Sequence, residues 1–180
     1  MAASGRLKEV VAVRLRERFE GLLFAVLAAA KELYGERLVT LAVFGSVGRG
    51  TPRPDSDVDI LVVARNLPRG RLARVAEFER VEERVANLLE ELAGEGITTS
   101  LAPVIKTPEE VNRGSLLFLD MVDDARVLYD RDGFFRRFLK RLRARLEELG
   151  AERTRYAGTW VWVLKKKYVP GEEFGGLKWW

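Results

Sequence analysis

The sequence contains neither histidine nor cysteine. Without histidine, imidazole cannot act as a general base, as a zinc ligand or as the partner of a nucleophilic serine or cysteine. Without cysteine there are no disulfides and no thiolate metal sites, and cysteine usage says nothing about the redox compartment. Any catalysis by this chain must therefore depend on carboxylates, metal ions, hydroxyl groups, lysine and arginine.

Long hydrophobic runs are also missing. The longest apolar stretch, near residues 22–30, is too short to cross a bilayer. The first five residues are not followed by the apolar segment of a signal peptide. We therefore expect a cytoplasmic protein that does not enter a membrane.

The composition that is present is typical of a globular domain. The 180 residues are 47% hydrophobic and 32% charged, and this length is enough to bury a core in one domain. The net charge of +4 and the pI near 9.5 suit an anionic ligand, but this excess alone does not indicate nucleic acid. Arginine outnumbers lysine and amides are scarce, which fits either a thermophilic source or a GC-rich genome.

Hydrophobic periodicity predicts helices that alternate with strands. The longer helices are expected at residues 6–34, 71–93 and 134–149, and the strands at 38–44, 57–64, 97–105 and 125–129. This alternation predicts an α/β (α+β) fold, a mixed β-sheet with helices packed on one side. We expect a core domain over residues 1–130, and over 131–180 a helix and a strand-like tail, residues 159–164, packed on that core.

Two polar elements interrupt the apolar pattern between the first two strands. Gly45 and Ser46 end the first strand, and Asp57 and Asp59 begin the second. Strand alternation places both carboxylates on one face, where they repel each other unless a cation lies between them. A Gly-Ser turn offers backbone N–H groups and a hydroxyl to a phosphate. Although each element alone is common in structural turns, this combination predicts phosphoryl or nucleotidyl transfer.

The motif Gly-Ser, ten intervening residues and Asp-x-Asp resembles the signature of polymerase-β-like nucleotidyltransferases, in particular the minimal nucleotidyltransferases of archaea and bacteria. The resemblance covers about residues 37–105, and residues 128–135 are similar to an archaeal branch of that group. It implies Mg²⁺-dependent transfer of a nucleoside monophosphate from a nucleoside triphosphate such as ATP to a hydroxyl acceptor, with release of pyrophosphate. The acceptor implied is a protein, a small molecule or RNA.

The resemblance also assigns roles to residues. Asp57 and Asp59 would be catalytic and would bind Mg²⁺, whereas Gly45 and Ser46 would hold the β- and γ-phosphates. Arg49 would contact the triphosphate or form a salt bridge with Asp55. We expect Ser56 to form a local cap or to orient the loop rather than to react.

The sequence departs from the family at the third strand, where active members usually carry another carboxylate. Ser100 is the best match to that position and is not acidic. Three alternatives follow: the enzyme works with two aspartates, a carboxylate from elsewhere substitutes, or activity is reduced or lost. The substitutes considered are Glu95, Asp120, Asp123 and Asp124, of which the last two read more simply as turn residues before the fourth strand.

The resemblance further implies partners. Some minimal nucleotidyltransferases are antitoxins that modify a HEPN-type protein with AMP, and others resemble drug-modifying enzymes. The alternative class is a non-catalytic module that binds a nucleotide or a partner. The arginines of residues 134–149 suit a solvated helix, so nucleic acid is not favoured. Trp160, Trp162 and residues 165–167 form a candidate contact surface, although the tryptophans could instead pack on the core or a second subunit of a homo-oligomer.

Overall fold

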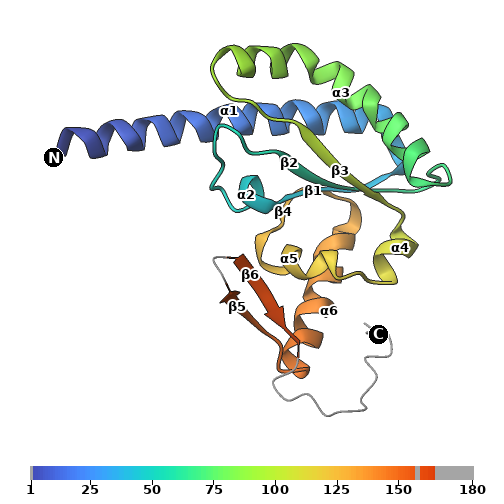
Figure 1. The fold of residues 1–180 in the computed structure, drawn as a ribbon. Helices are drawn as coiled ribbons and strands as arrows, with labels where there is room; N and C mark the ends of the chain where they lie inside the picture. Colours follow the sequence, from blue (N-terminus) through green and yellow to red (C-terminus); the bar gives the residue numbers. More distant parts are fainter. Residues whose placement is uncertain (1, 157–158, 165–180) are drawn as a thin grey trace.

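A mixed four-stranded sheet forms the centre of the molecule (Figure 1). The structure is a computed structural model, and it describes residues 2–156 and 159–164. The strand order is β3-β2-β1-β4, with β1 antiparallel to both β2 and β4 and with β2 parallel to β3. The strands are β1 Leu38–Phe44, β2 Val58–Ala64, β3 Leu101–Lys106 and β4 Arg126–Asp130. The expectation of a mixed sheet is confirmed.

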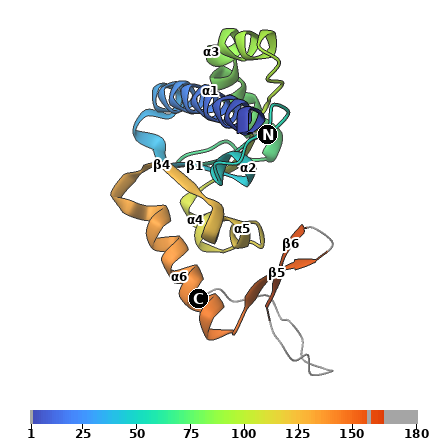
Figure 2. The same ribbon diagram turned by 90° about the vertical axis from the view of Figure 1, so that its left-hand side faces the viewer.

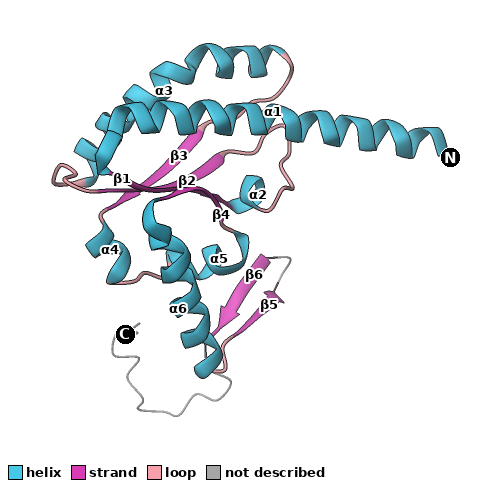
Figure 3. Ribbon diagram, turned by 180° about the vertical axis from the view of Figure 1, so that it is seen from behind, coloured by secondary structure: helices cyan, strands magenta, loops and turns pink. Residues whose placement is uncertain are grey.

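Helices cover both faces of this sheet, so the expectation that they pack on one side is wrong (Figures 2 and 3). The longer helices α1 and α3 lie on one face, and α4, α5 and α6 lie on the other. The helices are α1 Ala2–Tyr34, α3 Arg71–Gly94, α4 Pro108–Asn112, α5 Leu117–Asp124 and α6 Phe134–Glu148. The N-terminal end of α1 extends beyond the sheet (Figure 1).

The sequence of β1 explains the two covered faces. Leu41 and Val43 belong to the core cluster formed with α1 and α3, whereas Val39 and Ala42 belong to the cluster formed with α4, α5 and α6. Six of the seven β1 residues are buried. A strand that is apolar on both faces must have a packing layer on each of them.

The C-terminal part of the described chain is a helix followed by a hairpin. The strands β5 Glu152–Tyr156 and β6 Thr159–Val163 form a separate antiparallel sheet. The strand-like character expected at residues 159–164 is confirmed, but β5 was not expected. Trp162 packs against the core cluster of α5 and α6, which favours the core contact over an exposed surface. Residues 165–167 lie outside the described residues, and the division at residue 130 stays a prediction.

Helix α6 begins where a side chain from β4 caps it. The carboxylate of Asp130 accepts hydrogen bonds from the N–H groups of Phe135 (2.9 Å) and Arg136 (3.1 Å). These N–H groups have no partner within the helix, so the carboxylate stabilises its first turn.

Within the described part of the chain, no helix has the length and hydropathy needed to cross a bilayer.

Candidate active site

The segment after β1 forms a short helix, α2 Gly45–Gly48, where a simple turn was expected. Gly45 begins this helix with a φ of +65°, a region that favours glycine. A Cβ atom at Gly45 would lie 2.2 Å from Oδ2 of Asp59. The missing side chain therefore allows the Asp59 carboxylate to lie against the start of α2.

The loop between α2 and β2 is organised by Ser56. Its Oγ accepts hydrogen bonds from the Ser46 hydroxyl (3.0 Å) and from the Arg53 N–H (2.9 Å). Its carbonyl oxygen accepts a hydrogen bond from the Thr99 hydroxyl at 2.7 Å. Ser56 thus connects α2 with the segment that enters β3, and its expected role in orienting the loop is confirmed.

The two aspartates lie at the start of β2 in different environments. Asp57 directly precedes the strand and is exposed, whereas Asp59 is half-buried within it. Burial raises the pKa of Asp59, the nearby Asp57 charge raises it further, and the Arg49 guanidinium opposes both effects. A divalent cation would relieve this repulsion, and hard carboxylate oxygens are suitable Mg²⁺ ligands. The chemistry of the pair therefore fits a metal site.

The segment that enters β3 supplies a hydroxyl at the position where active members of the family usually carry a carboxylate. Ser100 precedes β3, which begins at Leu101 and not at Ile97 as expected. Oδ1 of Asp57 accepts hydrogen bonds from the Ser100 hydroxyl (2.7 Å) and from the Ser100 N–H (3.3 Å). Asp59 is paired with Ala102 in the parallel register. Neither neighbour on this strand is acidic.

Among the side chains that the structure describes, there is no cluster of three or more carboxylates that could hold a metal. Of the carboxylates considered as substitutes, Glu95 forms an ion pair with Arg18 at 2.6 Å. At the end of α5, Asp123 forms an ion pair with Arg143 and Asp124 forms one with Arg153. Among the described residues, the aspartate pair with Ser100 is therefore the candidate set of oxygen ligands for a metal.

Arg49 forms its ion pair with Asp124 and not with Asp55. The distance between Arg49 Nη1 and Asp124 Oδ2 is 2.8 Å. Arg153 binds the same carboxylate through two hydrogen bonds of 2.9 and 2.7 Å. Asp123 and Asp124 end α5, and Asp124 is 8% exposed, so their interpretation as turn residues is wrong. The hydrogen bond from Arg153 is the main cause of the lowered pKa of Asp124, and Arg49 adds to this effect.

Sequence reasoning considered Asp124 only as a substitute for the third carboxylate and did not single out Arg153, because no local pattern joins either residue to Arg49. Arg153 lies 29 positions after Asp124, in a polar strand that hydrophobic periodicity does not reveal. The one available signal was an arginine in the motif loop that needed a carboxylate partner. Spacing alone did not identify that partner.

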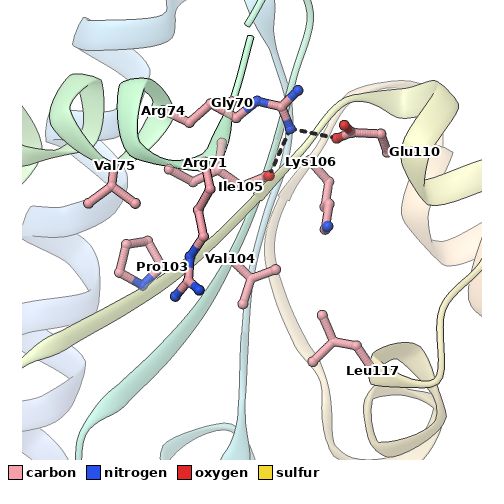
Figure 4. A pocket seen from close by; sticks show the side chains of 10 residues that line it. All are labelled: Gly70, Arg71, Arg74, Val75, Pro103, Val104, Ile105, Lys106, Glu110 and Leu117. Carbon is pink, nitrogen blue, oxygen red and sulfur yellow. Dashed lines mark hydrogen bonds and ion pairs between the residues drawn. The ribbon is translucent and has the colours of Figure 1, made fainter. Parts of the chain in front are cut away.

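A separate hollow of about 510 Å³ lies at the outer edge of β3 (Figure 4). Arg71 and Arg74 of α3 and Lys106 of β3 line it together with apolar side chains. Arg74 donates to the Ile105 carbonyl (3.3 Å) and to the Glu110 carboxylate (2.7 Å). None of the predicted site residues lines this hollow.

Comparison with known proteins identifies the family of this chain. A family model described as a nucleotidyltransferase domain matches residues 25–118. A candidate protein adenylyltransferase of Methanocaldococcus jannaschii is 31% identical over 119 residues, which span 65% of this chain and 76% of the relative. This chain therefore belongs to the nucleotidyltransferase domain family. It is an enzyme of that class, and the fold and the resemblance expected from the motif are confirmed.

Solved structures give more distant likenesses. One is a toxin–antitoxin crystal structure with AMP-PNP, with a TM-score of 0.42 and 18% identity over 70% of this chain and 90% of that chain. Another is a candidate nucleotidyltransferase from Sulfolobus solfataricus, with a TM-score of 0.32 and 16% identity over 67% and 85% of the two chains. Structural similarity at these TM-scores is too low to assign site residues or partners.

Proposed function

We propose that this nucleotidyltransferase transfers AMP from ATP to a hydroxyl group of a protein, and that the reaction depends on Mg²⁺. The observation that carries the proposal is the contact of the Asp59 carboxylate with Gly45, with Asp57 beside it. This contact brings the carboxylate pair to the start of α2, where N–H groups and Ser46 suit a phosphate. The relative named for protein adenylylation supports ATP and a protein acceptor.

In the proposed reaction, the acceptor oxygen attacks the α-phosphorus of ATP. The bond from that phosphorus to the bridging oxygen of pyrophosphate breaks, and the hydroxyl proton is released. Mg²⁺, when bound by Asp57 and Asp59, would offset the negative charge of the triphosphate. Gly45 and Ser46 would hold the β- and γ-phosphates, and Arg49 would add positive charge beside them. Catalysis would thus rest on positioning and electrostatics.

Ser100 would act on Asp57 rather than on the substrate. Its hydroxyl donates to Oδ1 of Asp57, so it fixes the orientation of the carboxylate and leaves Oδ2 for a metal ion. This arrangement supports the alternative in which the enzyme works with two aspartates. A HEPN-type partner, a homo-oligomer and a cytoplasmic location stay predictions.

A transfer assay tests the proposal. Purified protein is incubated with Mg²⁺, ATP labelled at the α-phosphate and the soluble proteins of its source cells, and labelled protein and pyrophosphate are measured. We expect label in protein with the wild type, and a loss of at least about 10²-fold with Asp57→Asn or Asp59→Asn, since each removes charge that a metal requires. Asp55→Asn, an exposed loop aspartate in the same segment, is the matched control.

The second candidate function is a non-catalytic nucleotide-binding module, which the non-acidic Ser100 and Ala102 favour. Calorimetry with Mg²⁺ and a non-hydrolysable ATP analogue separates the two functions. Binding without pyrophosphate release or label transfer for any acceptor would support the module. A wild type that neither binds the analogue nor releases pyrophosphate would rule out both functions.

A further inference from the structure

The C-terminal hairpin contacts the segment of the proposed nucleotide site through one carboxylate. Asp124, the last residue of α5, binds Arg49 directly after α2 and Arg153 of β5. In Figures 1 and 3, α2, α5 and the hairpin lie one after another along the same side of the molecule. A residue far from the motif thus shares an ion pair with a residue of the motif.

The backbone around this carboxylate is closely packed. A Cβ atom at Gly48 would lie 2.7 Å from the carbonyl oxygen of Asp124, so α2 and the end of α5 are in direct contact. Across the hairpin, Arg153 is paired with Trp162, which packs against the core. The segments that carry Arg49 and Arg153 are therefore held next to Asp124 by packing as well as by charge.

The charges around Asp124 do not cancel. Arg153 also lies 3.6 Å from Asp123, which Arg143 binds at 2.7 Å. Three guanidinium groups thus face two carboxylates, which leaves one positive charge in excess. Arg153 holds Asp124 with two hydrogen bonds and its side chain is 15% exposed, whereas Arg49 uses one hydrogen bond and is 39% exposed. A bidentate arginine–carboxylate pair is the stronger of the two arrangements. The excess charge is therefore placed on Arg49, whose field reaches Asp59.

We propose that Arg153 is a positioning residue for the nucleotide: it neutralises Asp124, and this leaves the charge of Arg49 available to the triphosphate. The proposal rests on the proposed function, because it needs a triphosphate at Gly45 and Ser46. Without Arg153, Asp124 and Arg49 form a closed neutral pair. The site then has one positive charge less, although no residue that touches the nucleotide has changed.

The test is a double-mutant cycle on nucleotide affinity. Binding of Mg²⁺ with a non-hydrolysable ATP analogue is measured by calorimetry for the wild type, Arg153→Ala, Arg49→Ala and the double variant. We expect Arg153→Ala to weaken binding roughly tenfold, the loss of about one hydrogen bond to a charged group. In the Arg49→Ala background, the same substitution should change the affinity less than about twofold.

Two further variants separate positioning from a general loss of structure. Arg153→Lys keeps the charge without the bidentate geometry, so an intermediate affinity is expected; it also serves if Arg153→Ala does not fold. Arg145→Ala removes an arginine from an exposed ion pair with Glu148 and should bind the analogue as the wild type does. Thermal unfolding of each variant confirms that the compared proteins are folded.

The outcomes are distinct. A wild type that does not bind the analogue overturns the proposed function. If the wild type binds and Arg153→Ala binds equally well, the positioning role is wrong while the proposed function stands. Equal losses from Arg153→Ala with and without Arg49 would show that Arg153 acts by another route, and this also overturns the inference.

Discussion

At the scale of the residue, Gly45 does two things in one position. Its positive φ begins α2, and its missing side chain leaves room for Asp59. Gly50 also has a positive φ, +71°, but a Cβ atom there would meet nothing within 4 Å. A substitution at Gly50 therefore tests the cost of the backbone conformation alone, whereas a substitution at Gly45 adds the collision with the Asp59 carboxylate.

We expect Gly45→Ala to reduce AMP transfer by about 10²-fold or more, because Asp59 must move by an ångström or more to avoid the new methyl group. Gly50→Ala should cost about 1–2 kcal/mol of backbone strain, as Gly45→Ala does, but should keep most of the activity. Transfer rates and urea unfolding of both variants are compared with those of the wild type. Equal losses of activity in the two variants would contradict this role of Gly45.

A second prediction concerns Ser100, which donates its hydroxyl to Asp57. Ser100→Asp places a third carboxylate beside this pair, so repulsion should lower the thermal unfolding midpoint when EDTA is present. Mg²⁺ should then raise the midpoint by more than it does in the wild type, since the ion binds only the folded state. Thr98→Asp, which adds the same charge at an exposed position, is the control.

The response to Mg²⁺ decides how Ser100 is understood. If the Ser100→Asp midpoint rises no more than that of Thr98→Asp, the third position does not adjoin the metal site. A larger rise together with faster transfer would show that residue 100 adjoins the metal site. The natural enzyme would then work with two aspartates at a site that can accept a third.

The sequence points to candidate residues whose pattern is local. Gly45, Ser46, Asp57 and Asp59 belong to one short motif, and the structure places Gly45 against Asp59 and Ser46 against Ser56, contacts that the motif itself did not specify. The Asp124 carboxylate could not be found in the same way. Its two arginines lie 75 positions before it and 29 positions after it, and many arginines of this chain were equally suitable partners.

At the scale of the element, the helices and the central strands follow from periodicity, but the start of β3 and the whole of β5 do not. Residues 97–100 are suitable for a strand, yet the ladder with β2 begins only where Val58 pairs with Leu101. In the preceding loop, Thr99 donates its hydroxyl to the Ser56 carbonyl, and Ser100 donates its hydroxyl to Asp57 while its carbonyl oxygen accepts from the Val58 N–H. Strand β5 is Glu-Arg-Thr-Arg-Tyr and has almost no apolar pattern, so its pairing with β6 defines it. Pairing partners, which spacing does not reveal, decide both cases.

The ion pairs of Asp124 join three elements, α2, α5 and β5, and predict a pH-dependent stability. The arginines, Arg153 first, lower the pKa of Asp124 in the folded protein. A carboxyl group with a lowered pKa adds stability above the ordinary pKa of aspartate, and this stability is lost as the pH falls through the folded value. The contribution should be constant between pH 7 and about 5 and should decline below about 4.

Asp124→Asn tests this dependence. At pH 7 we expect the variant to be about 2 kcal/mol less stable than the wild type, because two arginines lose their shared carboxylate. The difference should shrink steadily in urea unfolding experiments between about pH 4 and pH 2.5. Glu148→Gln, which alters an exposed pair with Arg145, should change stability by less than about 0.5 kcal/mol at either pH. A difference for Asp124→Asn that is independent of pH would contradict the assignment.

At the scale of the whole molecule, one sheet separates two hydrophobic cores. The cluster on the α1 and α3 face contains Phe78, and the cluster on the α4, α5 and α6 face contains Phe138, both fully buried. Strand β1 contributes side chains to both clusters in alternation. Loss of packing on either face therefore removes support from the same strand, and the site lies at the end of that strand, where β1 continues into α2.

This shared strand predicts that the two cores unfold together. Phe78→Ala and Phe138→Ala should each lower the free energy of unfolding by about 3–5 kcal/mol, because each leaves a cavity in a closely packed core. Phe24→Ala, at a position of α1 that is 76% exposed, is the matched control and should change it by less than about 0.5 kcal/mol. In urea, circular dichroism and tryptophan fluorescence should give coincident single transitions for all variants. All four tryptophans lie at or after residue 160, and Trp162 among them packs against the α5 and α6 face. A fluorescence transition that shifts in Phe138→Ala but not in Phe78→Ala would show that the two cores are independent.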